Sequence, residues 1–121
     1  MSAGIIYIVD DDEAVRDSMR TLLESYDFNV RDFESGSDLL EDGGLSRCDC
    51  LLLDLHMPAM NGLELVEALR ARGLATPAIL ITGKGDTLLA PRLAAAGVSV
   101  ILYKPVSSDE LFHAIETTMA G

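Results

Sequence analysis

Basic residues are scarce in this sequence. Nine lysines and arginines stand against twenty aspartates and glutamates, and the net charge is −11 at pH 7. Neutralising nucleic-acid phosphates needs clustered lysine and arginine side chains, so this composition argues against direct binding of DNA or RNA. The sequence also lacks an uncharged apolar run of roughly 18 residues, which a transmembrane helix needs, and the basic flank of a signal peptide. We therefore expect a cytoplasmic protein that does not enter a membrane.

Cysteine is also rare, with Cys48 and Cys50 as the two examples. A disulfide between such close neighbours would be strained, and two thiolates alone do not complete a zinc site, so we expect both to be packing residues. At 121 residues, 49% of them hydrophobic, the chain is long enough for one core and too apolar for a disordered region. The expected organisation is a single domain, residues 1–121.

Short segments rich in isoleucine, valine and leucine alternate with stretches of helical periodicity. Alternating strands and helices predict an α/β fold with a parallel sheet. Three of the segments are continuously apolar, as expected for strands that are covered on both faces. The five expected strands are Ile5–Val9, Phe28–Phe33, Cys50–Leu53, Ala78–Ile81 and Ser99–Tyr103.

Apolar spacing and capping residues predict the helices. Ser35 and Asn61 each precede an acid by three residues, which resembles a capping box, more closely at Asn61. Pro91 is tolerated only in a first turn, so a fourth helix should begin near residues 90–91 and end at Gly97, leaving residues 84–89 as a loop. The expected buried stripes are Val15, Met19, Leu22, Leu23 and Tyr26 in the first helix, and Leu111, Ile115 and Met119 in a fifth helix opening near Ser108.

Polar residues stand where four of the expected strands end. Asp10 and Asp11 follow the first strand, and Asp54, Thr82 and Lys104 follow the third, fourth and fifth. The carboxyl ends of parallel strands share one edge, and ligands bind there in the crevice where the strand order reverses. Helix capping and solvated turns would explain Asp10, Asp11 or Thr82. They explain Asp54 and Lys104 poorly, because an unpaired buried charge is costly.

Three carboxylates in one crevice repel one another, by about 4 kcal/mol per pair at roughly 4 Å and an effective dielectric constant near 20. Lys104 supplies one compensating charge. Oxygen ligands without clustered histidine or thiolate suit Mg²⁺, which keeps coordination positions open for phosphate oxygens. A magnesium ion, a lysine and a hydroxyl together form a phosphoryl-binding set, and Asp54 is then the expected nucleophile, because a carboxylate can form an acyl phosphate.

Four segments, in order, resemble the response-regulator receiver domains of two-component signalling over essentially the whole chain: IVDDDEAVR, LLLDLHMPAMNGLEL, ILITGKGD and LYKP. The resemblance implies a flavodoxin-like (βα)5 fold, with a doubly wound, five-stranded parallel sheet in the order 2-1-3-4-5. It implies that Asp54 is the phosphoacceptor and that Lys104 and Thr82 contact the phosphoryl group. The implied Mg²⁺ ligands are Asp10, Asp11, Asp54 and the backbone carbonyl of His56.

The resemblance also implies a cis peptide between Lys104 and Pro105, a turn shaped by Met57 and Pro58, and the usual glycine of the next helix at Gly62. The side chain of His56 is expected to point from the rim and at most to modulate access to the phosphoryl group. His113, in the last helix, is expected to be a surface residue.

One position departs from the family pattern. The family usually places phenylalanine or tyrosine three residues before the lysine, as an aromatic switch that turns inward on activation, whereas this chain has Ile101 there and Tyr103 directly before Lys104. Ile101 and Tyr103 share a face by strand alternation, so which of them takes the switch role stays open. We expect phosphorylation to rearrange residues 83–103 and so change what that face binds.

The leading hypothesis is a signalling receiver that takes a phosphoryl group from a sensor histidine kinase. It would then switch the face formed by its fourth helix, fifth strand and fifth helix to control a partner protein or an output domain. It is not expected to be an enzyme beyond self-catalysed phosphoryl transfer and autodephosphorylation. The ITGKGD segment resembles receivers attached to helix-turn-helix transcription factors, which favours a receiver cut from a longer transcriptional regulator over one that acts alone. A phosphorylation-dependent homodimer through the fourth helix and fifth strand stays open.

Two alternatives belong to other classes. A magnesium-dependent phosphohydrolase would also form an aspartyl phosphate, but such enzymes usually carry a second acid where this chain has His56. A degenerate receiver would bind a partner without phosphorylation, and the retention of the complete set Asp10, Asp11, Asp54, Thr82 and Lys104 opposes this.

Overall fold

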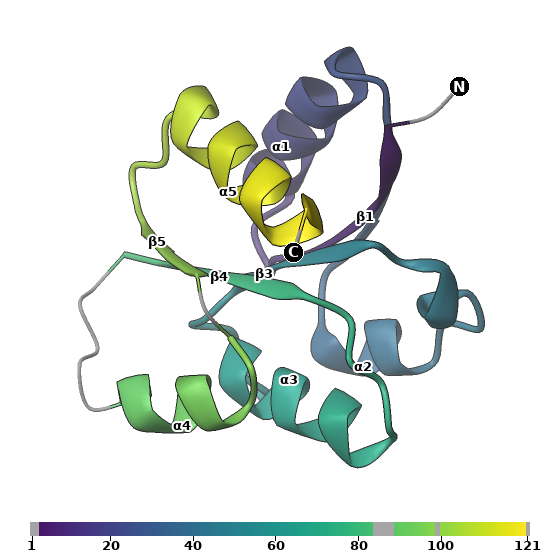
Figure 1. The fold of residues 1–121 in the computed structure, drawn as a ribbon, viewed down its shortest axis with the longest axis vertical. Coiled ribbons are helices and arrows are strands. Elements are labelled where there is room, and N and C mark those ends of the chain that lie inside the picture. The colour runs from purple at the N-terminus through teal and green to yellow at the C-terminus, as the bar shows by residue number, and fades with distance from the viewer. Residues whose placement is uncertain (1–2, 84–88, 99, 121) are drawn as a thin grey trace.

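A computed structural model describes residues 3–83, 89–98 and 100–120. Five parallel strands form one sheet in the order β2-β1-β3-β4-β5, which confirms the predicted fold and strand order. Helices α1 and α5 cover one face of the sheet, and α2, α3 and α4 cover the other (Figure 1). The elements are β1 (Gly4–Val9), α1 (Glu13–Ser25), β2 (Phe28–Phe33), α2 (Gly36–Leu40), the short 3₁₀ helix η1 (Leu45–Arg47), β3 (Cys50–Asp54), α3 (Gly62–Ala71), β4 (Ala78–Thr82), α4 (Ala90–Ala95), β5 (Val100–Tyr103) and α5 (Ser108–Ala120).

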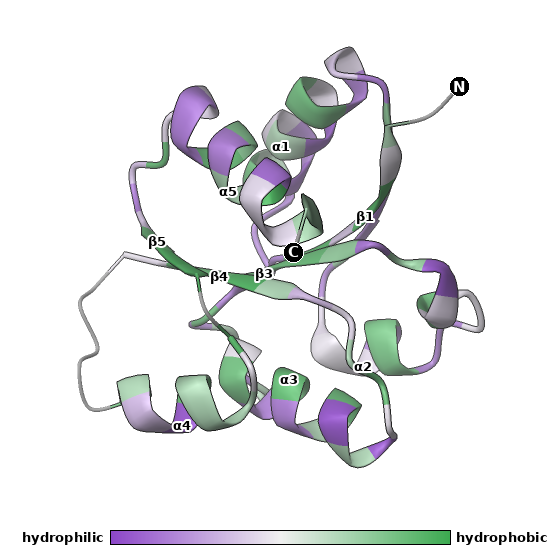
Figure 2. Ribbon diagram, viewed as in Figure 1, coloured by the Kyte–Doolittle hydropathy of each residue, from purple (hydrophilic) through white to green (hydrophobic). Residues whose placement is uncertain are grey.

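The central strands are buried on both faces, as their apolar sequences predicted. Every residue of β3 and β4 is buried, and both strands lie in the hydrophobic middle of the molecule (Figure 2). Successive side chains of a strand point to opposite faces. Leu51 and Leu53 therefore join the core beneath α2, α3 and α4, while Cys50 and Leu52 join the core beneath α1 and α5.

The strands β3 and β4 each extend one residue further than the sequence predicted. Asp54 pairs with Ile81, and Thr82 pairs with Tyr103, so both polar residues belong to the strands themselves. The apolar pattern could not reveal this, because backbone pairing does not depend on the polarity of the side chain. Asp54 and Thr82 are consequently fixed by the hydrogen bonding of the sheet.

The predicted stripe of α1 is correct for Leu23, which is fully buried, and for Met19 and Leu22, which pack against the core. Tyr26 differs. It is the residue that ends the helix, it is 41% exposed, and its ring stacks on Phe112 of α5 with centroids 4.4 Å apart.

The predicted capping residues begin their helices. Asn61 and Glu64 form a complete capping box at α3, in which each side chain accepts a hydrogen bond from the backbone N–H of the other residue. Ser35 caps α2 by accepting a hydrogen bond from the N–H of Asp38. In the last helix, Leu111 and Ile115 are buried and Met119 packs against the core.

The fourth helix begins where Pro91 predicted, with the proline in its first turn. Gly97 follows its end with a φ of +83°, which is the left-handed conformation that glycine adopts without strain. The predicted loop of residues 84–89 lies almost wholly outside the described residues. Leu89, its last residue, packs against the core.

Both cysteines are buried and unbridged, as predicted. Burial raises the pKa of each thiol to about 12, so both stay protonated and unreactive at neutral pH. Among the described residues, no helix combines the length and the apolar character that a membrane span needs.

Candidate functional site

The strand order brings the predicted polar residues to one edge of the sheet. The chain runs from β1 to β2 on one side and then crosses to β3 on the other, so the order reverses between β1 and β3. Asp10 directly follows β1, Asp54 ends β3, Thr82 ends β4, and Lys104 directly follows β5. All four therefore lie at the carboxyl ends of neighbouring strands, where open α/β sheets bind their ligands.

Three carboxylates gather at this edge. One oxygen each from Asp10, Asp11 and Asp54 lies within 4.8 Å of the others. Asp10 and Asp54 are buried, with 2% and 7% of their surface exposed, whereas Asp11 is exposed. The backbone N–H of Asp12 donates to Oδ1 of Asp10 at 2.8 Å, which fixes the orientation of that carboxylate.

Burial governs the titration of the two inner acids. Desolvation is the largest influence on each, and it raises the pKa of Asp10 and the pKa of Asp54 above the ordinary value. Lys104 lowers the pKa of both acids, whereas Asp11 raises both and Asp54 also raises the pKa of Asp10. The fold therefore holds acids in a place where their charged forms are disfavoured unless a cation joins them.

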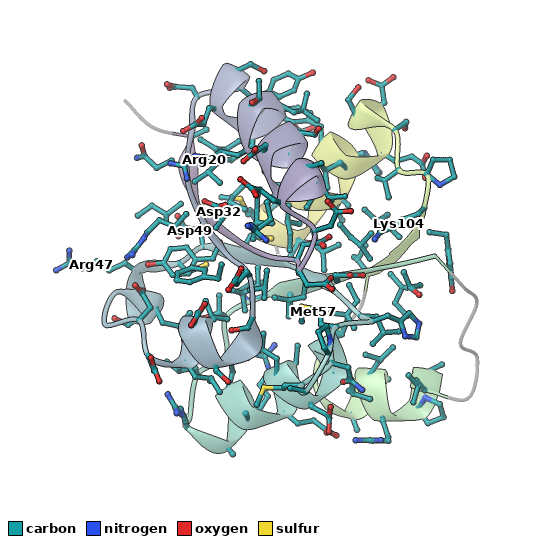
Figure 3. All side chains as sticks on the ribbon, turned by 180° about the vertical axis from the view of Figure 1, so that it is seen from behind. Arg20, Asp32, Arg47, Asp49, Met57 and Lys104 are labelled. Atoms are coloured by element: carbon teal, nitrogen blue, oxygen red, sulfur yellow. The ribbon has the colours of Figure 1, made fainter. Side chains whose placement is uncertain are left out.

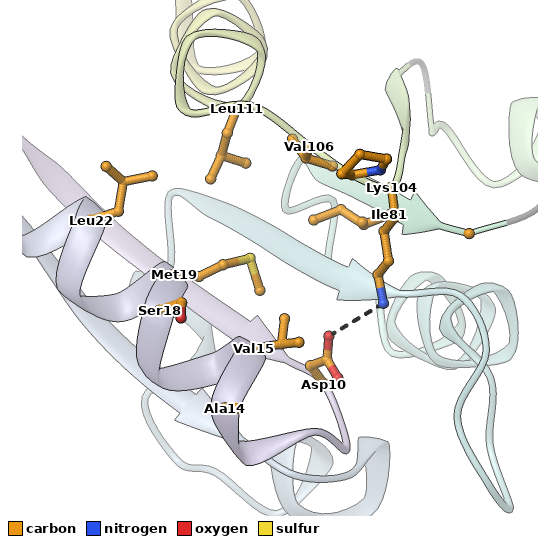
Figure 4. A pocket seen from close by; sticks show the side chains of 12 residues that line it. Asp10, Ala14, Val15, Ser18, Met19, Leu22, Ile81, Lys104, Val106 and Leu111 are labelled. Atoms are coloured by element: carbon orange, nitrogen blue, oxygen red, sulfur yellow. Dashed lines mark ion pairs between the residues drawn. The ribbon is translucent and has the colours of Figure 1, made fainter.

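Lys104 supplies one positive charge to the cluster. Its Nζ lies 3.5 Å from Oδ1 of Asp54 and 4.0 Å from Oδ2 of Asp10; the second contact is drawn in Figure 4. Its backbone N–H donates to the carbonyl of Thr82 at 2.8 Å, which ties the residue to the end of β4. The following peptide, to Pro105, is cis, as the family resemblance implied.

Two hollows meet at Lys104 and Gly83. A pocket of about 430 Å³ is lined by Asp54, His56, Gly83 and Lys104, so the Asp54 carboxylate is open to a ligand. His56 and Gly83 are exposed at its rim, as predicted for the histidine. A larger and mainly apolar groove of about 680 Å³ runs from Asp10 and Lys104 along α1 toward α5, where its walls include Val15, Met19, Leu22, Val106 and Leu111 (Figure 4).

The turn after Asp54 depends on a close backbone approach at Gly62. A Cβ added to Gly62 would lie 2.7 Å from the carbonyl oxygen of Asp54, which no side chain tolerates. The N–H of Gly62 donates to the carbonyl of Leu55 at 3.0 Å, so the first turn of α3 packs directly against the end of β3. Ala59, in the same turn, has a φ of +67°.

The region of the expected switch is only partly described. Ile101 is half-buried and packs against the core beneath α2 to α4, whereas Tyr103 is 51% exposed. Their pairing partners on β4 are Leu80 and Thr82, so they share one face of β5 as predicted. Thr82 itself is 1% exposed. His113 lies on the exposed side of α5, as predicted.

The donor set fits a hard divalent cation. All side-chain ligand atoms in the cluster are carboxylate oxygens, and the one exposed acid, Asp11, leaves the site accessible to water. Oxygen ligands with room for coordinated water are what Mg²⁺ prefers. The cluster therefore has the chemistry of a magnesium site in which an ion would offset the repulsion among three acids.

Sequence reasoning missed one residue at the site. The sequence alone indicated no role for Arg16, but its Nη1 donates to the backbone carbonyl of Asp10 at 2.7 Å and its Nε pairs with Asp32 at 3.2 Å. An arginine one turn into a helix that follows an acidic cluster was the available signal.

The chain matches the family model for the response regulator receiver domain over residues 6–116. Its relatives include the response regulator protein TodT of Pseudomonas putida, 38% identical over 97% of this chain and 52% of TodT. The transcriptional regulatory protein FixJ of Bradyrhizobium diazoefficiens is 37% identical over 96% of this chain and 57% of FixJ. The chain thus spans about half the length of these curated relatives.

Solved structures agree with this assignment. The response regulator StyR superposes with a TM-score of 0.88 at 38% identity, covering 96% of this chain and 59% of StyR. The chemotaxis protein CheY4 of Vibrio cholerae has the same fold, with a TM-score of 0.88 at 24% identity, covering 95% of this chain and 98% of CheY4. The family match, the sheet order and the acidic edge converge, and the chain belongs to the family of response-regulator receiver domains.

Proposed function

We propose that this chain is a signalling receiver that accepts a phosphoryl group on Asp54. One observation carries the proposal: the buried Asp54 carboxylate opens into a pocket while its oxygen lies 3.5 Å from the ammonium of Lys104 and within 4.8 Å of two further acids. An arrangement with only a structural purpose would pair the acid fully and close the pocket.

The proposed reaction is a displacement at phosphorus. An oxygen of Asp54 attacks the phosphorus of a phosphohistidine on a sensor kinase, an O–P bond forms as the N–P bond breaks, and the departing imidazole takes up a proton. The ammonium of Lys104 pairs with the phosphoryl oxygens, and the hydroxyl of Thr82 donates to one of them. Together with Asp54, these two residues form the proposed catalytic set.

Asp10, Asp11, Asp54 and the backbone carbonyl of His56 are the proposed ligands of Mg²⁺. Bound there, Mg²⁺ would neutralise charge on the phosphoryl oxygens and the acids at once. The ends of β1 and β3 hold Asp10 and Asp54 in place. Little free energy is therefore needed to reorganise these side chains when the ligand binds. Water can later hydrolyse the acyl phosphate through the same open pocket and release inorganic phosphate, which returns the receiver to its resting state without turnover of another substrate.

We further propose that residues 1–121 form one receiver domain that regulates an output domain or a partner protein. FixJ and the Rhodobacter capsulatus relative DctR are both named transcriptional regulatory proteins, which supports a role in transcription. The acidic composition supports regulation without direct DNA contact by this domain. The proposed location is the cytoplasm, where a sensor kinase would meet it.

The proposed output surface is the face of α4, β5 and α5. Tyr103 is half exposed on β5 and Ile101 lies two residues before it, so a movement of either, coupled to Thr82 across the β4–β5 pairing, would change that face. A phosphorylation-dependent homodimer through α4 and β5 is the form we propose to test. Sedimentation velocity with and without beryllofluoride is expected to show a dimer only with the phosphoryl mimic; an unchanged monomer would contradict this part of the proposal.

Acetyl phosphate tests the phosphoacceptor directly. After incubation with acetyl phosphate and Mg²⁺, intact-mass measurement is expected to show one added phosphoryl group on the wild-type protein and none on Asp54→Asn. Asp49→Asn is a matched control, since Asp49 is exposed and accepts a backbone hydrogen bond at the opposite end of the sheet. Equal labelling of wild type and Asp54→Asn would reject the assignment.

A further inference from the structure

Arg16 joins two parts of the chain behind the acidic cluster. Its side chain is 12% exposed, and its guanidinium makes two directed contacts: Nη1 donates to the carbonyl of Asp10 at 2.7 Å, and Nε pairs with Oδ2 of Asp32 at 3.2 Å. Asp32 lies near the end of β2 and pairs with Ile8 of β1 in the sheet. Arg16 therefore bridges the peptide that follows β1 to the neighbouring strand.

Three hydrogen bonds, one of them from Arg16, hold Asp10 in place. Its backbone N–H donates to the carbonyl of Phe33 at 3.2 Å, its carbonyl accepts from Arg16, and its carboxylate accepts from the N–H of Asp12. The bond from Arg16 and the bond to the ionised carboxylate are charge-assisted, and such bonds are shorter and stronger than neutral ones. The carbonyl of Asp10 belongs to the peptide that joins Asp10 to Asp11. Arg16 therefore restrains both of the acids that follow β1.

Arg20 provides an internal comparison. Its Nη1 pairs with Oδ1 of the same Asp32 at 2.7 Å, and Arg20 and Asp32 lie beside each other in Figure 3. Its side chain is 41% exposed and its Nε pairs with Glu24, on the side of α1 away from the loop. Arg16 and Arg20 thus share an anchor, but the hydrogen bond to the Asp10 carbonyl belongs to Arg16.

We propose that Arg16 is a positioning residue for the divalent-cation site, which clamps the carbonyl of Asp10 to Asp32 and so sets the directions of the Asp10 and Asp11 carboxylates. The inference rests on the proposed function, because it concerns the ion that the acidic cluster would hold. A planar guanidinium reaches the two partners from two different nitrogens in one fixed geometry, whereas a lysine carries all its donors on a single nitrogen and does not reproduce that geometry. Groups that orient metal ligands from outside the coordination sphere typically change metal affinity by about 10- to 100-fold when they are lost.

The test measures metal binding without any phosphoryl transfer. Free Mn²⁺, which shares the oxygen-ligand preference of Mg²⁺, is followed by electron paramagnetic resonance as each protein is titrated. Arg16→Met is expected to bind Mn²⁺ about 10-fold more weakly than wild type. Arg20→Met is expected to bind like wild type. Arg16→Lys should fall between, because it keeps the charge but lacks the two separate nitrogens of the guanidinium. Thermal unfolding in EDTA is measured in parallel, because each methionine variant removes one ion pair with Asp32 and any loss of stability must be compared with the loss of Mn²⁺ affinity.

Each outcome decides the proposal. Equal affinities for Arg16→Met and wild type would overturn it, as would an equal loss in Arg20→Met, since the effect would then come from Asp32 in general. Wild-type Mn²⁺ affinity in Arg16→Lys would also overturn the proposal, because the positive charge alone would then account for the effect. If Arg16→Met does not fold, the lysine variant carries the test. Failure of the wild type itself to bind Mn²⁺ would overturn both this inference and the proposed function, whereas the other outcomes leave the proposed function standing.

Discussion

Replacing Asp54 with asparagine should stabilise the metal-free protein. Asp54→Asn removes two repulsions, with Asp10 and Asp11, each about 3.5 kcal/mol at the 4.8 Å limit of the cluster and an effective dielectric constant near 20. It also removes the attraction to Lys104, about 5 kcal/mol at 3.5 Å on the same scale. The balance favours asparagine by about 2 kcal/mol before screening. Because Asp11 and Lys104 face solvent, we expect a gain of about 1 kcal/mol, or about 4 °C in Tm.

The gain should depend on pH. Desolvation raises the folded-state pKa of Asp54 above its usual value of 3.8, so ionising this group destabilises the folded state. The wild type therefore keeps its full stability only below pH 3.8, the usual pKa of the group. It loses part of that stability as the pH rises from there through the raised folded-state pKa. The difference between Asp54→Asn and wild type should be largest at neutral pH and should vanish below pH 3.8.

Thermal unfolding in EDTA across this pH range, with Asp17→Asn as an exposed control, measures the effect. Saturating Mg²⁺ should then stabilise the wild type more than Asp54→Asn, because the variant has lost a ligand, and so reduce or reverse the difference. A variant that is less stable than wild type in EDTA at neutral pH, or a difference that does not change with pH, would refute the electrostatic reasoning.

Two further substitutions probe the turn that carries Asp54. Gly62→Ala should destabilise the fold by about 2 kcal/mol and slow labelling by acetyl phosphate, because its Cβ would press on the Asp54 carbonyl; wild-type stability and labelling would contradict this close approach. Asn61→Ala should cost about 1 kcal/mol in urea unfolding by removing the capping box of α3, with Asn29→Ala as an exposed strand control; no loss would mean that the box contributes nothing.

The sequence predicted the sheet and its acidic edge because both follow from local patterns. Continuous apolar runs mark strands covered on both faces, and a polar residue at the end of such a run is conspicuous. Asp54 was found in this way, and Lys104 was found because it follows the fifth expected strand; the structure places the two side chains 3.5 Å apart. The starts of α3 and α4 were predictable for the same reason, because Asn61 and Pro91 each act within a single helical turn.

Contacts between distant segments could not be predicted in the same way. Arg16 lies on the polar side of an amphipathic helix, where an arginine usually meets solvent, and its role depends on the register that places Asp32 opposite Ile8. Tyr26 continued the apolar stripe of α1, but the helix ends there, and the ring packs against Phe112 from the other end of the chain. Both outcomes depend on tertiary packing, which the spacing of residues along one helix does not report.

The central claim is that the three acids and Lys104 form a site that receives a phosphoryl group with the help of a divalent ion. The most direct measurement is the extent of phosphoryl labelling from acetyl phosphate as a function of Mg²⁺ concentration, read by intact mass and followed by peptide mapping. We predict saturable, EDTA-sensitive labelling of one residue, Asp54. Labelling that persists in EDTA, or that maps to another residue, would contradict the claim.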